Sequence, residues 1–150
     1  MFRGQGATEY LVLLAVVLIV ALVSVALLGF FPGMAADARI TQSQSYWRGQ
    51  ARPFAILDSS INATAGTFVI QNMEANGPYT MTTLVVGNGT SGAITTAFAA
   101  GETKTVTMAT VIGAYSAGAV YDLGVNITYT TPSGVTSKQY GTKNLIGKYV

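Results

Sequence analysis

Four acidic residues in the second part of the chain have the clearest potential for catalysis or metal binding: Asp58, Glu74, Glu102 and Asp122. Two converging carboxylates can form a glycosidase pair, and a larger cluster can bind calcium. Their spacing matches no calcium-binding loop, and scattered acids are usually solvated surface residues. The chain contains no His and no Cys, which excludes Ser-His triads, thiolate nucleophiles, disulfides and nearly all zinc sites. We therefore expect no enzyme activity, no catalytic or metal-binding residue and no cofactor.

Residues 87–92, GNGTSG, match the G-x-G-x-x-G spacing of a dinucleotide-binding loop. Such a loop opens a helix and is followed about 20 residues later by an acid, whereas residues 93–99 read here as a strand. A hairpin turn fits better, because an Asn-Gly pair such as Asn88-Gly89 readily adopts the positive φ values of tight hairpins. The sequence therefore predicts a β-turn here and no nucleotide site.

Three Asn-x-Thr sequons make Asn62, Asn88 and Asn126 candidates for N-glycosylation. Asn126 is the strongest, because strand alternation places it with Thr128 on a polar face, whereas Asn88 belongs to a turn. Ordinary turn and strand residues would produce the same three patterns. Glycosylation is therefore an expectation that competes evenly with this simpler explanation.

A membrane-length apolar helix is the main element that precedes these candidates. Residues 11–31 carry no charge, and as a helix they would span about 31 Å, close to the thickness of a bilayer core. Pro32 and Gly33 should kink this helix, and helix-compatible sequence resumes over residues 34–52. We therefore expect one hydrophobic assembly or transmembrane helix over residues 5–52, kinked near Pro32.

After Pro53 the pattern changes to short alternating runs rich in Thr and punctuated by Gly. The clearest strand covers residues 121–130, and short connections favour antiparallel pairing. The other expected strands are residues 54–61, 67–73, 79–86, 93–99, 103–108 and 136–146. The sequence thus predicts an α+β fold in which the long helix is followed by an antiparallel, Ig-like β-sandwich domain over residues 53–150, able to fold alone.

The residues before the apolar run, RGQGATEYL at positions 3–11, form the most informative motif. They resemble the class III signal peptide of archaeal type IV-like prepilins, in which a basic residue and Gly precede the cut and Gln follows it. On this resemblance, cleavage falls between Gly4 and Gln5, removes a leader of residues 1–4 and leaves the apolar helix attached. Glu9 would become the fifth residue of the mature chain, followed by Tyr10 and Leu11 as further assembly residues.

The resemblance implies a structural subunit of an extracellular adhesion pilus, with helices in the filament core and β domains in the outer sheath. It also implies the partners: identical subunits in a helical homopolymer, a prepilin peptidase, the pilus assembly machinery, and the cytoplasmic membrane before assembly. Glu9 beside an apolar run needs a compensating charge, which the new α-amine of Gln5 in a neighbouring subunit could supply.

Two other classes of protein explain part of the pattern. A surface binding domain anchored by a single membrane helix accounts for the apolar run, with Glu9 in the lipid headgroup zone, but leaves the leader unexplained. An archaellum filament subunit shares assembly through a helical core. Nucleic-acid binding is not expected, because a net charge of +2 and 9% charged residues provide no dense basic surface.

Overall fold

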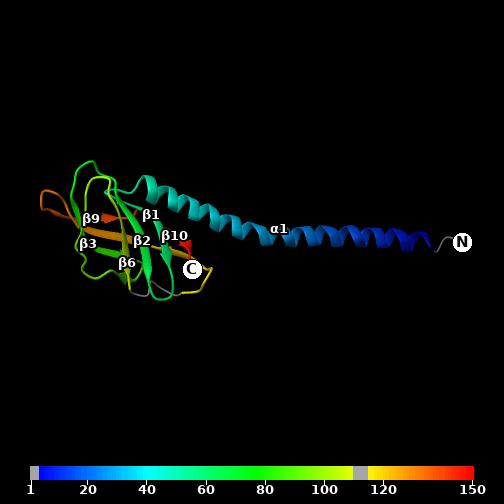
Figure 1. Cartoon of the computed structure of the whole chain (residues 1–150). Helices are drawn as coiled ribbons and strands as arrows, with labels where there is room; N and C mark the ends of the chain where they lie inside the picture. Colours follow the sequence, from blue (N-terminus) through cyan, green and yellow to red (C-terminus); the bar gives the residue numbers. More distant parts are fainter. Residues whose placement is uncertain (1–3, 110–114) are drawn as a thin grey trace. The chain divides into compact units, whose positions relative to one another are not determined.

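Figure 1 shows the computed structural model of the chain, which describes residues 4–109 and 115–150. One long N-terminal helix, α1 (Gln5–Gly49), is followed by antiparallel sheets, which confirms the expected α+β class. The chain divides into two compact units, Met1–Ala38 and Arg39–Val150. We call them the helix unit and the head unit and describe each separately.

The helix α1 runs from Gln5 to Gly49 without an interruption at Pro32 or Gly33. Its apolar part is rich in Leu, which favours helices, and in Val, and a helix satisfies every backbone polar group where water is absent. Proline inside a helix lacks the N–H donor and crowds the preceding turn, so the kink expected at this position stays a prediction. The helix ends where the amides of Gln50 and Ala51 both donate to the Tyr46 carbonyl, at 2.8 and 3.0 Å.

In the described part of the head unit, ten strands form three sheets, and every strand pair there is antiparallel, as expected. The sheets have the orders β1-β2-β6, β10-β7, and β4-β3-β8-β9 with β5 also on β3. The strands are β1 (Phe54–Ile61), β2 (Gly66–Asn72), β3 (Tyr79–Val86), β4 (Gly89–Thr90), β5 (Thr96–Phe98), β6 (Thr103–Met108), β7 (Val120–Leu123), β8 (Val125–Thr130), β9 (Thr136–Tyr140) and β10 (Leu145–Lys148).

The single strand expected over residues 121–130 is wrong, because the chain changes sheets at Gly124. β7 pairs with β10, whereas β8 pairs with β3 and β9. The carbonyl of Gly124 leaves the ladder and accepts a hydrogen bond of 2.8 Å from the Gly87 amide. From Tyr121 to Ile127, buried or partly buried residues still alternate with exposed ones, so the sequence pattern gives no sign of the break.

The strand expected over residues 136–146 is likewise two strands, β9 and β10, separated by residues 141–144. The Trp47 indole lies against the backbone at Gly141, where an added Cβ would come within 2.5 Å of the Trp47 Cζ2 atom. Only glycine permits this approach. The break between β9 and β10 therefore lies where the chain passes Trp47, a helix residue that is remote in sequence.

The hairpin expected at residues 87–92 is present, but its turn residues differ from the prediction. Val86 pairs with Gly89, so Gly87 and Asn88 form a two-residue loop between β3 and β4. Gly87 has φ of 57°, and no residue other than glycine has positive φ among those described. Glycine at the first loop position is typical of a type II′ turn rather than the type I′ turn that Asn88-Gly89 predicted.

One hydrophobic core joins all three sheets to the last turns of α1. Trp47 of the helix is 1% exposed within it, and Phe54, Phe68, Leu84 and Ile127 of the strands are fully buried. The head unit consequently begins at Arg39, so that it includes residues 39–52, which the composition assigned to the helix segment. A domain cut at residue 53 would lose part of its own core.

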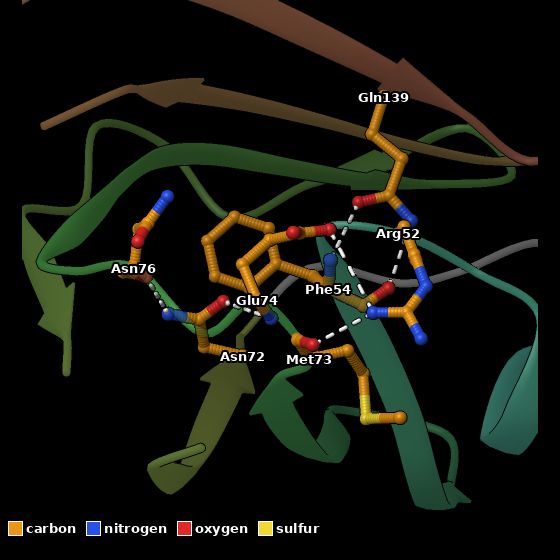
Figure 2. A network of polar contacts seen from close by, with 7 residues as sticks. All are labelled: Arg52, Phe54, Asn72, Met73, Glu74, Asn76 and Gln139. Carbon is orange, nitrogen blue, oxygen red and sulfur yellow. Dashed lines mark hydrogen bonds and ion pairs between the residues drawn. The ribbon is translucent and has the colours of Figure 1, made fainter. Parts of the chain in front are cut away.

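The side chain of Gln139 links the edges of two sheets (Figure 2). Its Oε1 accepts from the Phe54 amide at 3.0 Å, and its Nε2 donates to the Phe54 carbonyl at 2.8 Å. β1 and β9 are edge strands of different sheets. The buried carboxamide of Gln139 therefore makes the two hydrogen bonds to Phe54 of β1 that the backbone of a neighbouring strand would make.

Replacing Gln139 with Leu should lower the free energy of unfolding by about 2–4 kcal/mol, because the buried N–H and C=O of Phe54 would both lose their partner. Urea titration of the full chain in detergent micelles measures this, with the fluorescence of Trp47, the only tryptophan, as the probe. Lys138→Leu, on the exposed face of the same strand, is the matched control and should change little. Equal midpoints for Gln139→Leu and wild type would contradict a linking role.

Candidate functional site

The most unusual surface of the chain is the apolar part of α1. We call residues 11–28 the apolar span. All of its side chains are exposed within the helix unit, with its large hydrophobic residues between 42% exposed for Leu14 and 71% for Leu28. The most apolar 18-residue window of the helix has a mean hydropathy of 3.4 and is 0% buried. By length and composition this helix can cross a membrane.

The apolar span is hydrophobic around its whole circumference, as in helices that lie in lipid or inside a larger assembly. Each large aliphatic side chain removed from water contributes about 1.5–3 kcal/mol, so the span requires a cover. The Thr8 and Ser24 hydroxyls on this part of α1 each make a hydrogen bond within the helix unit. Thr8 donates to the Gly4 carbonyl at 2.8 Å, and Ser24 donates to the Val20 carbonyl at 2.7 Å. Neither hydroxyl therefore requires an external hydrogen-bond partner.

The predicted processing residues lie at the start of α1. Gly4 is in the turn that precedes the helix, and Gln5 is its first residue. The peptide bond expected to be cut therefore lies at the boundary between turn and helix. The rest of the leader, residues 1–3, lies outside the described residues, and cleavage at this bond stays a prediction.

Glu9, Tyr10 and Leu11 follow one another on α1 and are all exposed. Successive helix residues are about 100° apart, so these three side chains leave the helix in different directions. Glu9 shares its face instead with Leu13, four residues on, and Val12 lies next to them. The sequence named Tyr10 and Leu11 as companions of Glu9, and helical spacing adds Val12 and Leu13. The carboxylate thus adjoins an apolar surface on its C-terminal side.

The last turns of α1 are held in the head unit by residues 141–146. The buried Ser43 hydroxyl donates to the Asn144 carbonyl at 2.8 Å and accepts from the Ile146 amide at 2.9 Å. Tyr46 accepts a hydrogen bond of 3.2 Å from the Thr142 amide. We call Ser43, Tyr46 and Trp47 the helix anchor. Sequence analysis missed Ser43, although it lies on the same helix face as Trp47, four residues away.

A shallow polar depression adjoins the anchor, between α1, β7 and the connection from β9 to β10. Arg39 forms an ion pair with Asp122 there, and the Asn144 carboxamide donates to the same carboxylate at 2.7 Å. These polar groups bind one another, and the ion pair between Arg39 and Asp122 helps to hold the last turns of α1 in the head unit.

Each of the four acids considered for catalysis has a local partner. Among residues 4–109 and 115–150, no three His, Cys, Asp or Glu side chains are placed to hold a metal. The Ala99 amide, at 2.7 Å, and then Lys104 lower the pKa of the Glu102 carboxyl. The pairs are Asp122 with Arg39, Glu74 with Arg52, Glu102 with Lys104, and Asp58 with the Ser59 amide.

Two tyrosines of the head unit have perturbed pKa values. Burial raises the pKa of Tyr121, whose hydroxyl lies 2.9 Å from the Ser59 hydroxyl. Burial also raises the pKa of Tyr129. Both shifts come mainly from desolvation in the core, which disfavours the charged phenolate. They are therefore typical of packed core residues.

The three sequon asparagines are all exposed, in different local structures. Asn62 lies in the turn from β1 to β2, where its Oδ1 accepts hydrogen bonds from the Thr64 amide, the Thr64 hydroxyl and the Ala65 amide. Asn88 lies in the two-residue turn after β3, and Asn126 lies within β8. Each is accessible to solvent, and their modification stays a prediction.

The sequence was compared with protein families and with curated proteins. No protein-family model matches the sequence, and no curated protein matches it either. The apolar span and the residues that precede it are therefore the features that bear on function.

Proposed function

We propose that the chain is the structural subunit of an extracellular archaeal type IV-like pilus. The observation that carries this proposal is the complete exposure of the apolar span in a chain whose head unit already has a closed core. In the filament, the spans of many identical subunits cover one another, and the head units form the outer sheath. Helix packing then replaces the lipid that covers the span before assembly.

The sequence before the span favours a filament over a permanent membrane anchor. Cleavage at Gly4–Gln5 would leave α1 intact, because the helix begins at Gln5. An ordinary secretory signal loses its apolar segment on cleavage. The partners that follow from this proposal are identical subunits, a prepilin peptidase, the assembly machinery and the cytoplasmic membrane.

The head unit suits an outer sheath of adhesion pili. Its three antiparallel sheets share one core, and we infer that the sheets of β1-β2-β6 and β4-β3-β8-β9 are the two layers of an Ig-like sandwich. A closed core of this kind leaves the head unit stable outside the cell, without disulfides. An archaellum subunit would share these features and remains the second filament candidate.

A surface binding domain anchored by α1 is the alternative from another class. The same exposed span supports it, since lipid alone can cover an apolar helix of this length. The two functions differ in the state of the mature protein. Lipid-anchored monomers stay with the membrane, whereas pilus subunits are recovered in filaments.

We expect cell-surface filaments removed by shearing to contain this chain beginning at Gln5. Digestion after Glu9 in denaturant distinguishes the two forms by mass spectrometry: a processed chain releases residues 5–9, and an unprocessed chain releases residues 1–9. Electron microscopy of the same fraction should show ordered filaments. Mature chains that begin near Ala36, or chains found only as membrane-bound monomers, would contradict a filament built on α1.

A further inference from the structure

We propose that Asn126 carries an N-linked glycan and that the ring of Tyr140 supports its first sugar. The acceptor site consists of three residues on two neighbouring strands. Asn126 and Thr128 of β8 supply the sequon, and Tyr140 of β9 supplies an aromatic surface. The two strands hold these side chains in register.

The Asn126 side chain points away from the core. Its neighbours Val125 and Ile127 are 1% and 0% exposed, so alternation places Asn126 on the outer face of the sheet. Among the described residues, no hydrogen bond occupies its carboxamide. The Nδ2 atom is therefore accessible and free to react.

Tyr140 lies directly opposite Asn126 in the antiparallel register of β8 and β9. Side chains in this arrangement have Cβ atoms about 4.5–5.5 Å apart and share one face of the sheet. Tyr140 is 63% exposed, although large aromatic residues are usually mostly buried. A sugar attached to Asn126 would cover this ring, because sugar C–H groups are attracted to the negative face of an aromatic ring.

The other two sequons lack this arrangement. Asn62 lies in a turn, and its Oδ1 already accepts three hydrogen bonds that fix the carboxamide. Asn88 is in the two-residue turn between β3 and β4, with no residue opposite it. Asn126 is thus the sequon with both an unoccupied carboxamide and an aromatic side chain beside it.

The modification is a group transfer from a polyprenyl-phosphate-linked oligosaccharide, with no oxidation or reduction. The Asn126 Nδ2 forms a bond to C1 of the first sugar, and the bond from C1 to the phosphate oxygen breaks. The Nδ2 proton leaves, and the lipid phosphate is released. The proposal requires the head unit to lie outside the cytoplasm, which holds for a filament subunit and equally for a membrane-anchored domain.

Tryptic digestion separates the candidate sites, because residues 105–138 contain only Asn126 and residues 49–104 contain both Asn62 and Asn88. We expect mass spectrometry of the full chain, made in a host that glycosylates surface proteins, to find glycan on peptide 105–138. Asn126→Gln and Thr128→Val should each abolish it. An unmodified 105–138 peptide in that host overturns the proposal, whether or not 49–104 carries sugar. A filament without this glycan would still support the proposed function.

The role of Tyr140 has its own test. Protons of the first sugar should show upfield ring-current shifts by NMR in wild type and in Tyr140→Phe, which keeps the ring. Tyr140→Ala should lose these shifts while glycan occupancy stays within about twofold of wild type. Unchanged sugar shifts in Tyr140→Ala would overturn the assignment of Tyr140 as a support.

Discussion

A fragment of residues 39–150 should fold cooperatively, whereas a fragment of residues 53–150 should show no cooperative unfolding transition. The shorter fragment lacks Trp47, which is 1% exposed in the core. Loss of a buried tryptophan side chain destabilises a domain by about 3–5 kcal/mol. It also lacks Ser43, so the Ile146 amide and the Asn144 carbonyl lose their partner, at about 1–3 kcal/mol each. These losses approach the whole stability of an ordinary domain, about 5–15 kcal/mol.

Circular dichroism during heating measures this for both fragments without a need for tryptophan. In the longer fragment, Trp47→Ala should reproduce much of the loss, and Gln42→Ala, at an exposed position of the same helix, should have little effect. If residues 39–150 and 53–150 melt at the same temperature, the helix anchor contributes nothing, and the domain begins at residue 53 as its composition indicated.

Glu9→Gln should reduce the ratio of subunit in sheared filaments to subunit in membranes by more than tenfold at equal expression. The substitution keeps the size and hydrogen-bonding capacity of the side chain but removes the charge proposed to pair with the α-amine of Gln5 in a neighbour. An amine left unpaired in an apolar core is destabilising by several kcal/mol, and about 1.4 kcal/mol corresponds to a factor of ten. Insertion into the membrane should be almost unchanged, because residue 9 would lie in the hydrated headgroup region of the bilayer.

Asp37→Asn is the matched control for this experiment, since Asp37 is the other acid of α1 and lies beyond the apolar span. Quantitative immunoblots of the sheared and membrane fractions give the ratio for each variant. A ratio for Glu9→Gln equal to that of wild type would remove Glu9 from the assembly mechanism and leave the role of the apolar span intact.

The sequence predicted the bounds of a strand correctly where a residue at its end, such as a proline, marks the boundary. The predicted ranges 54–61, 79–86 and 103–108 coincide with β1, β3 and β6. Pro53 and Pro78 precede two of these strands, and proline marks a strand start because it cannot donate to the ladder. The break at Gly124 has no comparable signal, because the buried and exposed alternation continues through it. A point at which the chain passes from one sheet to another therefore cannot be located from the sequence when the two-residue alternation of burial continues through it.

The apolar part of the candidate site could be predicted from the sequence, because it depends on composition alone. An uncharged run of 21 residues, 11–31, contains the apolar span and can be read directly from the sequence. The polar residues that hold the head unit together were missed, because their partners are remote in sequence. Gln139 bonds to Phe54 across 85 positions, and Ser43 bonds to Ile146 across 103. Before the fold is known, a buried Gln or Ser cannot be distinguished from an exposed one.

The way α1 enters the head unit has a consequence for proteolysis. Arg48, in the last turn of α1, and Arg52, in the connection from α1 to β1, each bind a backbone carbonyl through the guanidinium group. Arg48 donates to Leu57 at 2.7 Å, and Arg52 donates to Met73 at 2.7 Å. Trypsin-like enzymes must draw an arginine side chain and its flanking backbone into an extended conformation, which the contact of Arg48 opposes. The bond after Arg52 precedes Pro53, and such enzymes cut poorly before proline. The folded head unit should therefore resist cleavage by such proteases, which would protect a subunit in the extracellular filament proposed above.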